Sequence, residues 1–209
     1  MMTTRRTLAV ACAVARVFFS LLGPAESGVP AVPPAGGRKP LPLGSSANAA
    51  DVLCSYGPGI AAADVDGDSD VDLFVPGCGG AGRGSVLLRN DGAGRFADAA
   101  KGSGLEAEGP WVAAAFGDYD DDGRPDLYVT GPEGNRLYHN RGEGIFEDVT
   151  AAAGVAGGGL CLAPAWADAD HDGDLDLVVP RLGGSAGDGT GAPLLFLVNT
   201  GNGTFREMA

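Results

Sequence analysis

Three short windows of the sequence hold most of its acidic side chains. Residues 64–72, 118–126 and 168–176 contain five aspartates each, which together make 15 of the 27 acidic residues. Carboxylates at this density repel one another unless a cation lies among them. Each window has aspartate at its first, third, fifth and ninth positions, a spacing with which a tight loop offers alternate side chains to one ion. The windows are therefore candidate metal sites.

Calcium is the metal that this pattern favours, because it takes roughly six to eight oxygen ligands, whereas magnesium prefers near-octahedral sites and keeps its waters. An EF-hand is excluded, because the twelfth residue counted from the first aspartate of each window is a valine and not the bidentate glutamate. The ninth-position aspartate is expected to complete the site, and the seventh residue to supply its backbone carbonyl. Solvated acidic turns without metal are the alternative, which three aligned copies disfavour. The predicted ligands of three calcium ions are Asp64, Asp66, Asp68, Asp70 and Asp72; Asp118, Asp120, Asp122, Arg124 and Asp126; and Asp168, Asp170, Asp172, Asp174 and Asp176.

The first window differs from the others at its sixth position. Ser69 stands there, where the second and third windows have glycine. A sharp turn at this position favours glycine, and another residue there costs about 1 kcal/mol of strain. We therefore expect the first loop to bind calcium most weakly.

Two motifs recur three times in the same order. The acidic windows begin at Asp64, Asp118 and Asp168, 54 and 50 residues apart, and an Asn-x-Gly-x-Gly run follows each. That run predicts a tight hairpin with positive φ angles. Four short strands in a unit of about 50 residues predict a propeller blade, since a sandwich does not repeat with this period. The expected strands are 61–63, 113–115 and 165–167 (first); 73–75, 127–129 and 177–179 (second); strands ending at Asn90, Asn140 and Asn199 (third); and strands beginning at Phe96, Phe146 and Phe205 (fourth).

The expected fold is all-β, a partial β-propeller of three four-stranded blades in an open arc. The blades span about residues 51–105, 106–155 and 156–209. Closure of a propeller takes about four blades or more, and the last repeat stops where the second repeat continues. We therefore expect this chain to be part of a longer propeller. Assembly of several chains into a closed ring is the alternative.

The N-terminal segment predicts export. Residues 1–25 have a basic start, an apolar stretch over 8–22 and small residues before a cleavage point after Ala25. Arg16 and the short apolar length disfavour a membrane anchor. Residues 26–50 are rich in proline and glycine and predict a linker. The mature protein is expected to be secreted (extracellular, or periplasmic in a bacterium) and not to span a membrane.

The remaining chemistry-bearing residues do not suggest an enzyme. His139 falls in a strand with no evident partner and reads as a packed or surface residue, while His171 reads as solvent-facing in the third window. The sequence offers no evident pair of nucleophile and base. Trp111 and Trp166 are expected in the core. The formal net charge of −13 argues against nucleic acid as a partner.

Cysteine usage leaves one pairing open. Cys54 and Cys78 flank the first acidic window, so a disulfide between them is plausible in an oxidising compartment. Cys161 would remain unpaired and buried as a small apolar side chain.

The acidic loops and the apolar strands after them resemble FG-GAP or VCBS repeats, as in the integrin α-subunit propeller. The run from Leu137 to Val155 is similar to the cartilage acidic protein group and its bacterial relatives. This resemblance covers roughly residues 54–209 and implies a secreted, calcium-dependent propeller of about seven blades. It implies a role in adhesion or in recognition of an extracellular protein or glycan. The alternative is the non-catalytic propeller portion of a secreted enzyme, such as a polysaccharide lyase or a phospholipase.

Overall fold

The computed structural model describes residues 59–77, 84–106, 109–182 and 194–208. Within them, strands form three antiparallel sheets, and the short helix α3 (Thr150–Ala153) follows the second sheet. The predictions of an export signal, of a linker and of a disulfide between Cys54 and Cys78 fall outside the described residues.

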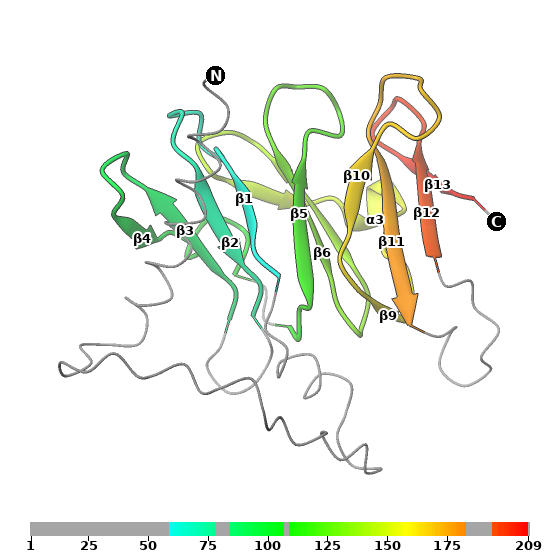
Figure 1. Ribbon diagram of the computed structural model, residues 1–209, viewed down its shortest axis with the longest axis horizontal. Helices are drawn as coiled ribbons and strands as arrows, with labels where there is room; N and C mark the ends of the chain where they lie inside the picture. Colours follow the sequence, from blue (N-terminus) through cyan, green and yellow to red (C-terminus); the bar gives the residue numbers. More distant parts are fainter. Residues whose placement is uncertain (1–58, 78–83, 107–108, 183–193, 209) are drawn as a thin grey trace, which may run out of the picture. The chain divides into compact units, whose positions relative to one another are not determined.

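Each sheet contains four consecutive strands, and neighbours along the chain are also neighbours in the sheet (Figure 1). The all-β prediction is confirmed, and every predicted strand is present, although β5 extends two residues and β11 four residues beyond the predicted length. The first sheet has β1 (Ala61–Ala63), β2 (Asp72–Val75), β3 (Val86–Asn90) and β4 (Phe96–Asp98); the second has β5 (Ala113–Gly117), β6 (Asp126–Thr130), β7 (Arg136–Asn140) and β8 (Phe146–Asp148); the third has β10 (Ala165–Ala167), β11 (Asp176–Leu182), β12 (Leu194–Asn199) and β13 (Phe205–Glu207).

The third sheet differs from the prediction by one strand. β9 (Leu160–Cys161) pairs with the far end of β11, where Arg181 is opposite Cys161. β11 is seven residues long, whereas β2 has four and β6 has five. Its extra length extends beyond β10 and lets β9 join as the fifth strand of the sheet.

The first strands of the three sheets lie next to one another, in the order β1, β5, β10 (Figure 1). Their alanines allow this close approach, since small side chains leave the backbones near each other. The N–H of Gly59 donates to the carbonyl of Val112 at 3.1 Å, and Trp166 Nε1 donates to the carbonyl of Ala115 at 3.3 Å. Four-stranded sheets with adjacent first strands are propeller-type blades, and we refer to them as the first, second and third blade.

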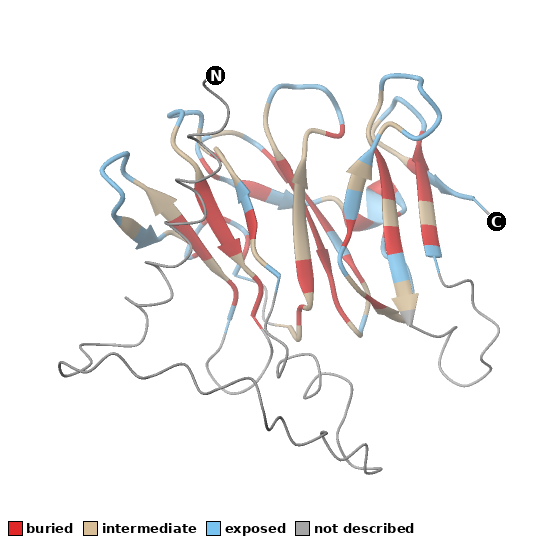
Figure 2. Cartoon of the chain, viewed as in Figure 1, coloured by how far each residue is buried: buried red, intermediate tan, exposed pale blue. Residues whose placement is uncertain are grey.

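The core consists of two apolar clusters, one between each pair of neighbouring blades. Leu127 and Val129 belong to the cluster with the first blade, whereas Tyr128 belongs to the cluster with the third. Successive side chains of a strand point to opposite faces of the sheet. β6 is therefore buried along its whole length (Figure 2). Burial of both faces explains why its apolar residues form a continuous run and do not alternate with polar ones.

Both tryptophans belong to these clusters, as expected from the sequence. Trp111 is buried in the first cluster, and Trp166 packs against the second, with its ring stacked on Tyr119 at a centroid distance of 6.4 Å. Cys161 is a buried free thiol in the second cluster.

Candidate metal centres

Each acidic loop connects the first strand of a blade to the second. The three loops lie at the same end of the sheets, at the top of Figure 1. The loop backbone is organised by its own carboxylates. Asp64 accepts hydrogen bonds from the N–H groups of Gly67 and Ser69, both at 2.8 Å. The fifth-position aspartate accepts a bond at 2.9 Å from the N–H of the seventh residue in every loop, through Asp68, Asp122 and Asp172.

Two positions in every loop have left-handed backbone. They are the fourth and the sixth, and in each loop one is glycine and the other is not. Ser69 has positive φ, as the sequence predicts, but the strain is not peculiar to the first loop and does not by itself single it out. The φ angles are 81° and 73° at Gly67 and Ser69, 56° and 84° at Asp121 and Gly123, and 65° and 103° at His171 and Gly173.

The ninth-position aspartates are fully buried and hold each loop to its own sheet. Each accepts one hydrogen bond from the N–H of the second loop residue and one from the N–H of the asparagine that ends the third strand. Asp72 accepts from Val65 (3.1 Å) and Asn90 (2.8 Å), Asp126 from Tyr119 (3.3 Å) and Asn140 (2.7 Å), and Asp176 from Ala169 (3.0 Å) and Asn199 (2.9 Å).

Four loop carboxylates carry charge that the protein alone stabilises poorly. Burial raises the pKa of Asp72, and raises the pKa of Asp126 to about 6 against the opposing effect of its backbone hydrogen bonds. Burial, with the nearby charge of Asp122, also raises the pKa of Asp120. In the third loop, desolvation and the charge of Asp172 raise the pKa of Asp170. Every loop thus contains a carboxylate whose ionised form a cation would stabilise.

Carboxylate oxygens converge in all three loops, as a calcium site requires. Oxygens of Asp168, Asp170 and Asp172 lie within 4.8 Å of one another, and the buried Oδ1 of Asp168 has no hydrogen-bond partner. An orphaned carboxylate oxygen among hard oxygen donors fits a calcium ion. The equivalent groups are Asp118, Asp120 and Asp122 in the second loop, and Asp64, Asp66 and Asp72 in the first.

The remaining predicted ligands are arranged less uniformly. Asp126 groups with Asp120 and His139, while Asp68 and Asp176 belong to no such group. Arg124, at a seventh position, extends its side chain to pair with Asp122 and donates from Nε to the carbonyl of Asn140 at 2.8 Å. The other seventh-position residues are Asp70 and Asp174, whose N–H groups donate to the fifth-position aspartates.

One position missed by the sequence analysis lies beside the loops. It immediately precedes the third-strand asparagine and is occupied by Arg89, His139 and Val198. Arg89 forms an ion pair with Asp66. His139 is buried, as one sequence reading proposed, but it has partners: Nδ1 lies 3.0 Å from Asp126 Oδ1 and 3.3 Å from Asp120 Oδ2. The only signal in the sequence is adjacency to the repeated asparagine.

The asparagines themselves connect neighbouring blades. Asn140 Nδ2 donates to the carbonyl of Val65 in the first acidic loop at 2.9 Å, and Asn199 Nδ2 donates to the carbonyl of Tyr119 in the second loop at 2.8 Å. Their Oδ1 atoms accept from the N–H of Gly142 and Gly201 in the following turns. Each of these asparagines therefore links its own turn to the acidic loop of the preceding blade.

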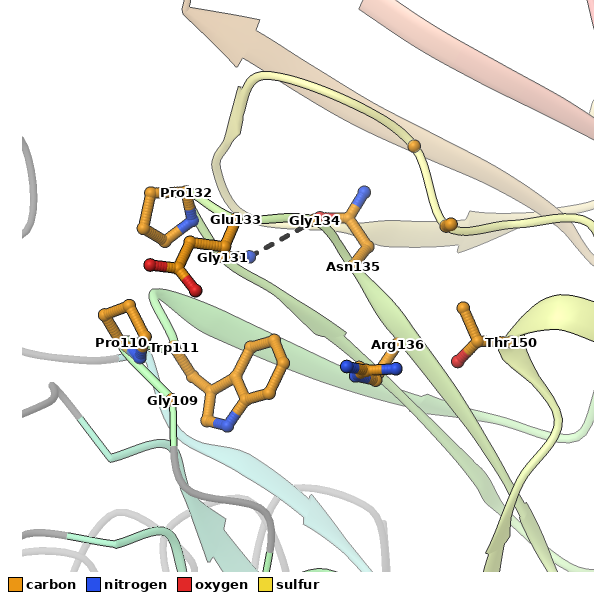
Figure 3. Close-up of a pocket in the computed structure, with 12 residues that line it drawn as sticks. Gly109, Pro110, Trp111, Gly131, Pro132, Glu133, Gly134, Asn135, Arg136 and Thr150 are labelled. Carbon is orange, nitrogen blue, oxygen red and sulfur yellow. Dashed lines mark hydrogen bonds between the residues drawn. The ribbon is translucent and has the colours of Figure 1, made fainter.

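A cavity of about 230 Å³ is shown in Figure 3. Most of its lining comes from residues before β5 and from the turn between β6 and β7, at the opposite end of the second blade from the acidic loop. Trp111, Asn135, Arg136 and Thr150 contribute to its lining, and the N–H of Gly131 donates to Asn135 Oδ1 at 3.4 Å. Arg136 is exposed, whereas Trp111 is buried. The lining thus combines an aromatic ring with groups that can form hydrogen bonds.

Comparison with protein families agrees with this geometry. A family model described as an FG-GAP-like repeat matches residues 64–129 and again 118–179, more than half of the chain. The chain belongs to the FG-GAP-like repeat family. Each match begins at the first aspartate of an acidic loop and ends in the second strand of the next blade. One FG-GAP-like match therefore spans the link between two neighbouring blades.

Among solved structures, the chain is similar to an Agrocybe aegerita lectin described for its specific recognition of non-reducing terminal N-acetylglucosamine. The sequences are 23% identical, the TM-score is 0.45, and the match covers 69% of this chain and 36% of the lectin chain. This FG-GAP-like chain thus spans little more than a third of the lectin's length. A search of curated proteins found no match. In the described part of the chain, no helix is long and apolar enough to cross a membrane.

Proposed function

We propose that this chain is a secreted, non-catalytic recognition module whose acidic loops bind calcium as a structural ion. The observation that carries the calcium proposal is the convergence of carboxylate oxygens in all three loops, with Asp168 Oδ1 buried and without a partner. Calcium supplies positive charge and oxygen coordination to such a group. The ligands in this proposal are the aspartates at loop positions one, three and five, with the seventh carbonyl and the ninth aspartate.

Hydrogen bonds within the protein support this proposed set of ligands. The ninth-position carboxylates tie the loops to the third strands, and Asn140 and Asn199 tie the loops to the following blades. A cation bound in a loop would therefore stabilise two blades and not only one turn. This arrangement favours a structural role for calcium.

The environment of His139 supports a non-catalytic module. Its Nδ1 faces Asp126 and Asp120, and its Nε2 lies 3.8 Å from Asp122 Oδ2. A general base has to reach a substrate proton with a free nitrogen. Surrounded by three carboxylates of the second loop, this imidazole belongs to the loop network.

Recognition is the role that the FG-GAP-like family suggests for such a module, and the partner we propose is an extracellular protein or glycan. The cavity beside Trp111 is a candidate contact region, because Glu133 and Arg136 expose charged side chains next to an aromatic ring. It lies away from the acidic loops. Calcium would thus support ligand binding through the stability of the blades, without touching the ligand.

Thermal unfolding tests the structural role of calcium. Each site that exists only in the folded state adds about 2.7 kcal/mol of stability at a calcium concentration a hundred times its Kd. The melting temperature should rise with calcium and fall in chelator, and magnesium at the same concentration should have a smaller effect. An unchanged midpoint in chelator would contradict the proposal.

A binding screen tests recognition. The protein is applied to glycan and extracellular-protein arrays with calcium and with chelator, beside the variants Glu133→Ala and Arg136→Ala. We expect binding that requires calcium and weakens in these variants. Release of cleaved product from a bound glycan or lipid would contradict the non-catalytic assignment.

A further inference from the structure

The three blades differ in charge at one equivalent position beside the acidic loops. Arg89, His139 and Val198 pair with Ala97, Glu147 and Arg206 of the fourth strands in the same register. The residue after each of them is the asparagine whose N–H binds the ninth-position aspartate. The backbone therefore presents these three side chains to the loops in the same way.

In the first blade, this position holds a fixed cation. Arg89 Nη2 forms an ion pair with Asp66 Oδ2, and the Asp66 side chain is only 3% exposed. That oxygen has no hydrogen-bond partner, so the guanidinium is the group that compensates its charge. A guanidinium does not lose its proton at physiological pH, so this compensation is permanent.

The third blade has the opposite arrangement. Val198 carries no charge, and among the described residues the buried Oδ1 of Asp168 has neither a hydrogen-bond partner nor an ion pair. The second blade is intermediate, because His139 lies beside Asp120 and Asp126 while Arg124 pairs with Asp122 at the partly exposed rim. Arg89 and Val198 therefore place opposite charge conditions beside the first and third loops.

We propose that Arg89 is the built-in counter-ion of the first acidic loop, which therefore binds calcium much more weakly than the third. The proposal rests on the proposed function, in that it takes the loops to be calcium sites. A guanidinium that already pairs with a ligand carboxylate opposes a second cation in two ways. It repels the ion, and it has to give up Asp66 before Asp66 can bind metal. The calcium affinity of each loop is thus set in part by a strand residue that lies outside the loop motif.

Calorimetric titration of the calcium-stripped full chain tests the proposal. For the wild type we expect the weakest site to have a Kd roughly ten or more times that of the strongest, as competition with a fixed nearby charge predicts. Arg89→Val, which copies the third blade, and Arg89→Gln, which keeps the side-chain length, should each tighten the weakest site by about that factor. Adding Asp66→Asn to Arg89→Val should remove this gain. Arg95→Ala is the matched control, because it removes one positive charge from an exposed pair with Asp91 and should change no Kd.

Unfolding in chelator provides a second readout. Arg89→Val leaves Asp66 without its partner, so its melting temperature should fall below that of Arg95→Ala, and saturating calcium should abolish this difference. A wild type with equal sites, or Arg89 variants that leave the weakest Kd unchanged, would overturn the counter-ion proposal while the calcium function stands. Absence of calcium binding to the wild type and to both Arg89 variants would overturn the calcium function together with the counter-ion proposal.

Discussion

The side-chain amide of Asn140 donates a hydrogen bond to the backbone carbonyl of Val65, 75 residues earlier in the chain, at 2.9 Å. The same amide donates to the carbonyl of Pro125 at 3.1 Å, so one side chain holds the acidic loops of two blades. Asn199 repeats this arrangement with Tyr119 and Leu175. Contact between neighbouring blades is thus specified by polar groups at the same end as the candidate calcium sites.

Replacement of Asn140 tests how much this link contributes. Asn140→Ala leaves two carbonyls and the N–H of Gly142 without their partner, and a buried unsatisfied group costs about 1–3 kcal/mol. Asn90→Ala is the matched control, because Asn90 makes the equivalent bonds in its own blade and, among the described residues, none to another blade. We expect Asn140→Ala to lower the free energy of unfolding by more than Asn90→Ala, measured by urea denaturation. Equal losses would show that the interblade bond contributes nothing.

The ninth-position aspartates should matter even without metal. Asp176 is fully buried and accepts hydrogen bonds from two backbone N–H groups. Asp176→Asn would turn an amide NH2 toward one of these donors, and it should lower the free energy of unfolding in chelator by about 1–3 kcal/mol. Asp170 is exposed and accepts one long bond from Asp172 at 3.3 Å. Asp170→Asn removes a charge that Asp172 repels, so it should keep or slightly raise the melting temperature in chelator and reduce the gain from calcium. If both variants behaved alike in chelator, the proposed metal-independent role of Asp176 would be wrong.

The two left-handed positions of the first loop can be exchanged. Ser69→Gly should stabilise the protein by about 1 kcal/mol, because glycine adopts positive φ without strain. Gly67→Ser should destabilise it by about the same amount through backbone strain. A steric clash would not contribute, because a Cβ at Gly67 would have no other atom within 4 Å. The double variant restores the pattern of the other two loops and should match the wild type. Equilibrium unfolding of the three variants measures these differences, and a double variant far from the wild type would contradict the strain argument.

Gly117 provides a test of packing between the second and third blades. A Cβ at this position would lie 2.6 Å from Trp166 Cδ1, closer than real side chains approach. Gly117→Ala should therefore destabilise the protein by about 1–3 kcal/mol, the usual cost of overpacking. Gly158→Ala is the control, because a Cβ there would meet nothing within 4 Å. Thermal melts of the two variants would refute the packing argument if both matched the wild type.

For the described residues, the sequence by itself determined the three four-stranded units, most of the strand limits and the acidic loops. These features are local, because runs of apolar residues, turn glycines and carboxylate spacing act within a few residues of each other. β1, predicted at 61–63, and the start of β8 at Phe146 agree with the structure for this reason. The positive φ of Ser69 was predictable on the same basis.

The tertiary structure alone decided how these local units act on one another. β9 pairs with β11 only because the third sheet extends beyond β10. Asn140 reaches Val65, and Arg89 reaches Asp66, because pairing of strands and packing of blades bring distant segments together. Such contacts depend on relative positions in space, which no spacing along the chain encodes. The acidic motif marks the candidate calcium loops, and the packed sheets determine which side-chain cation lies beside each loop.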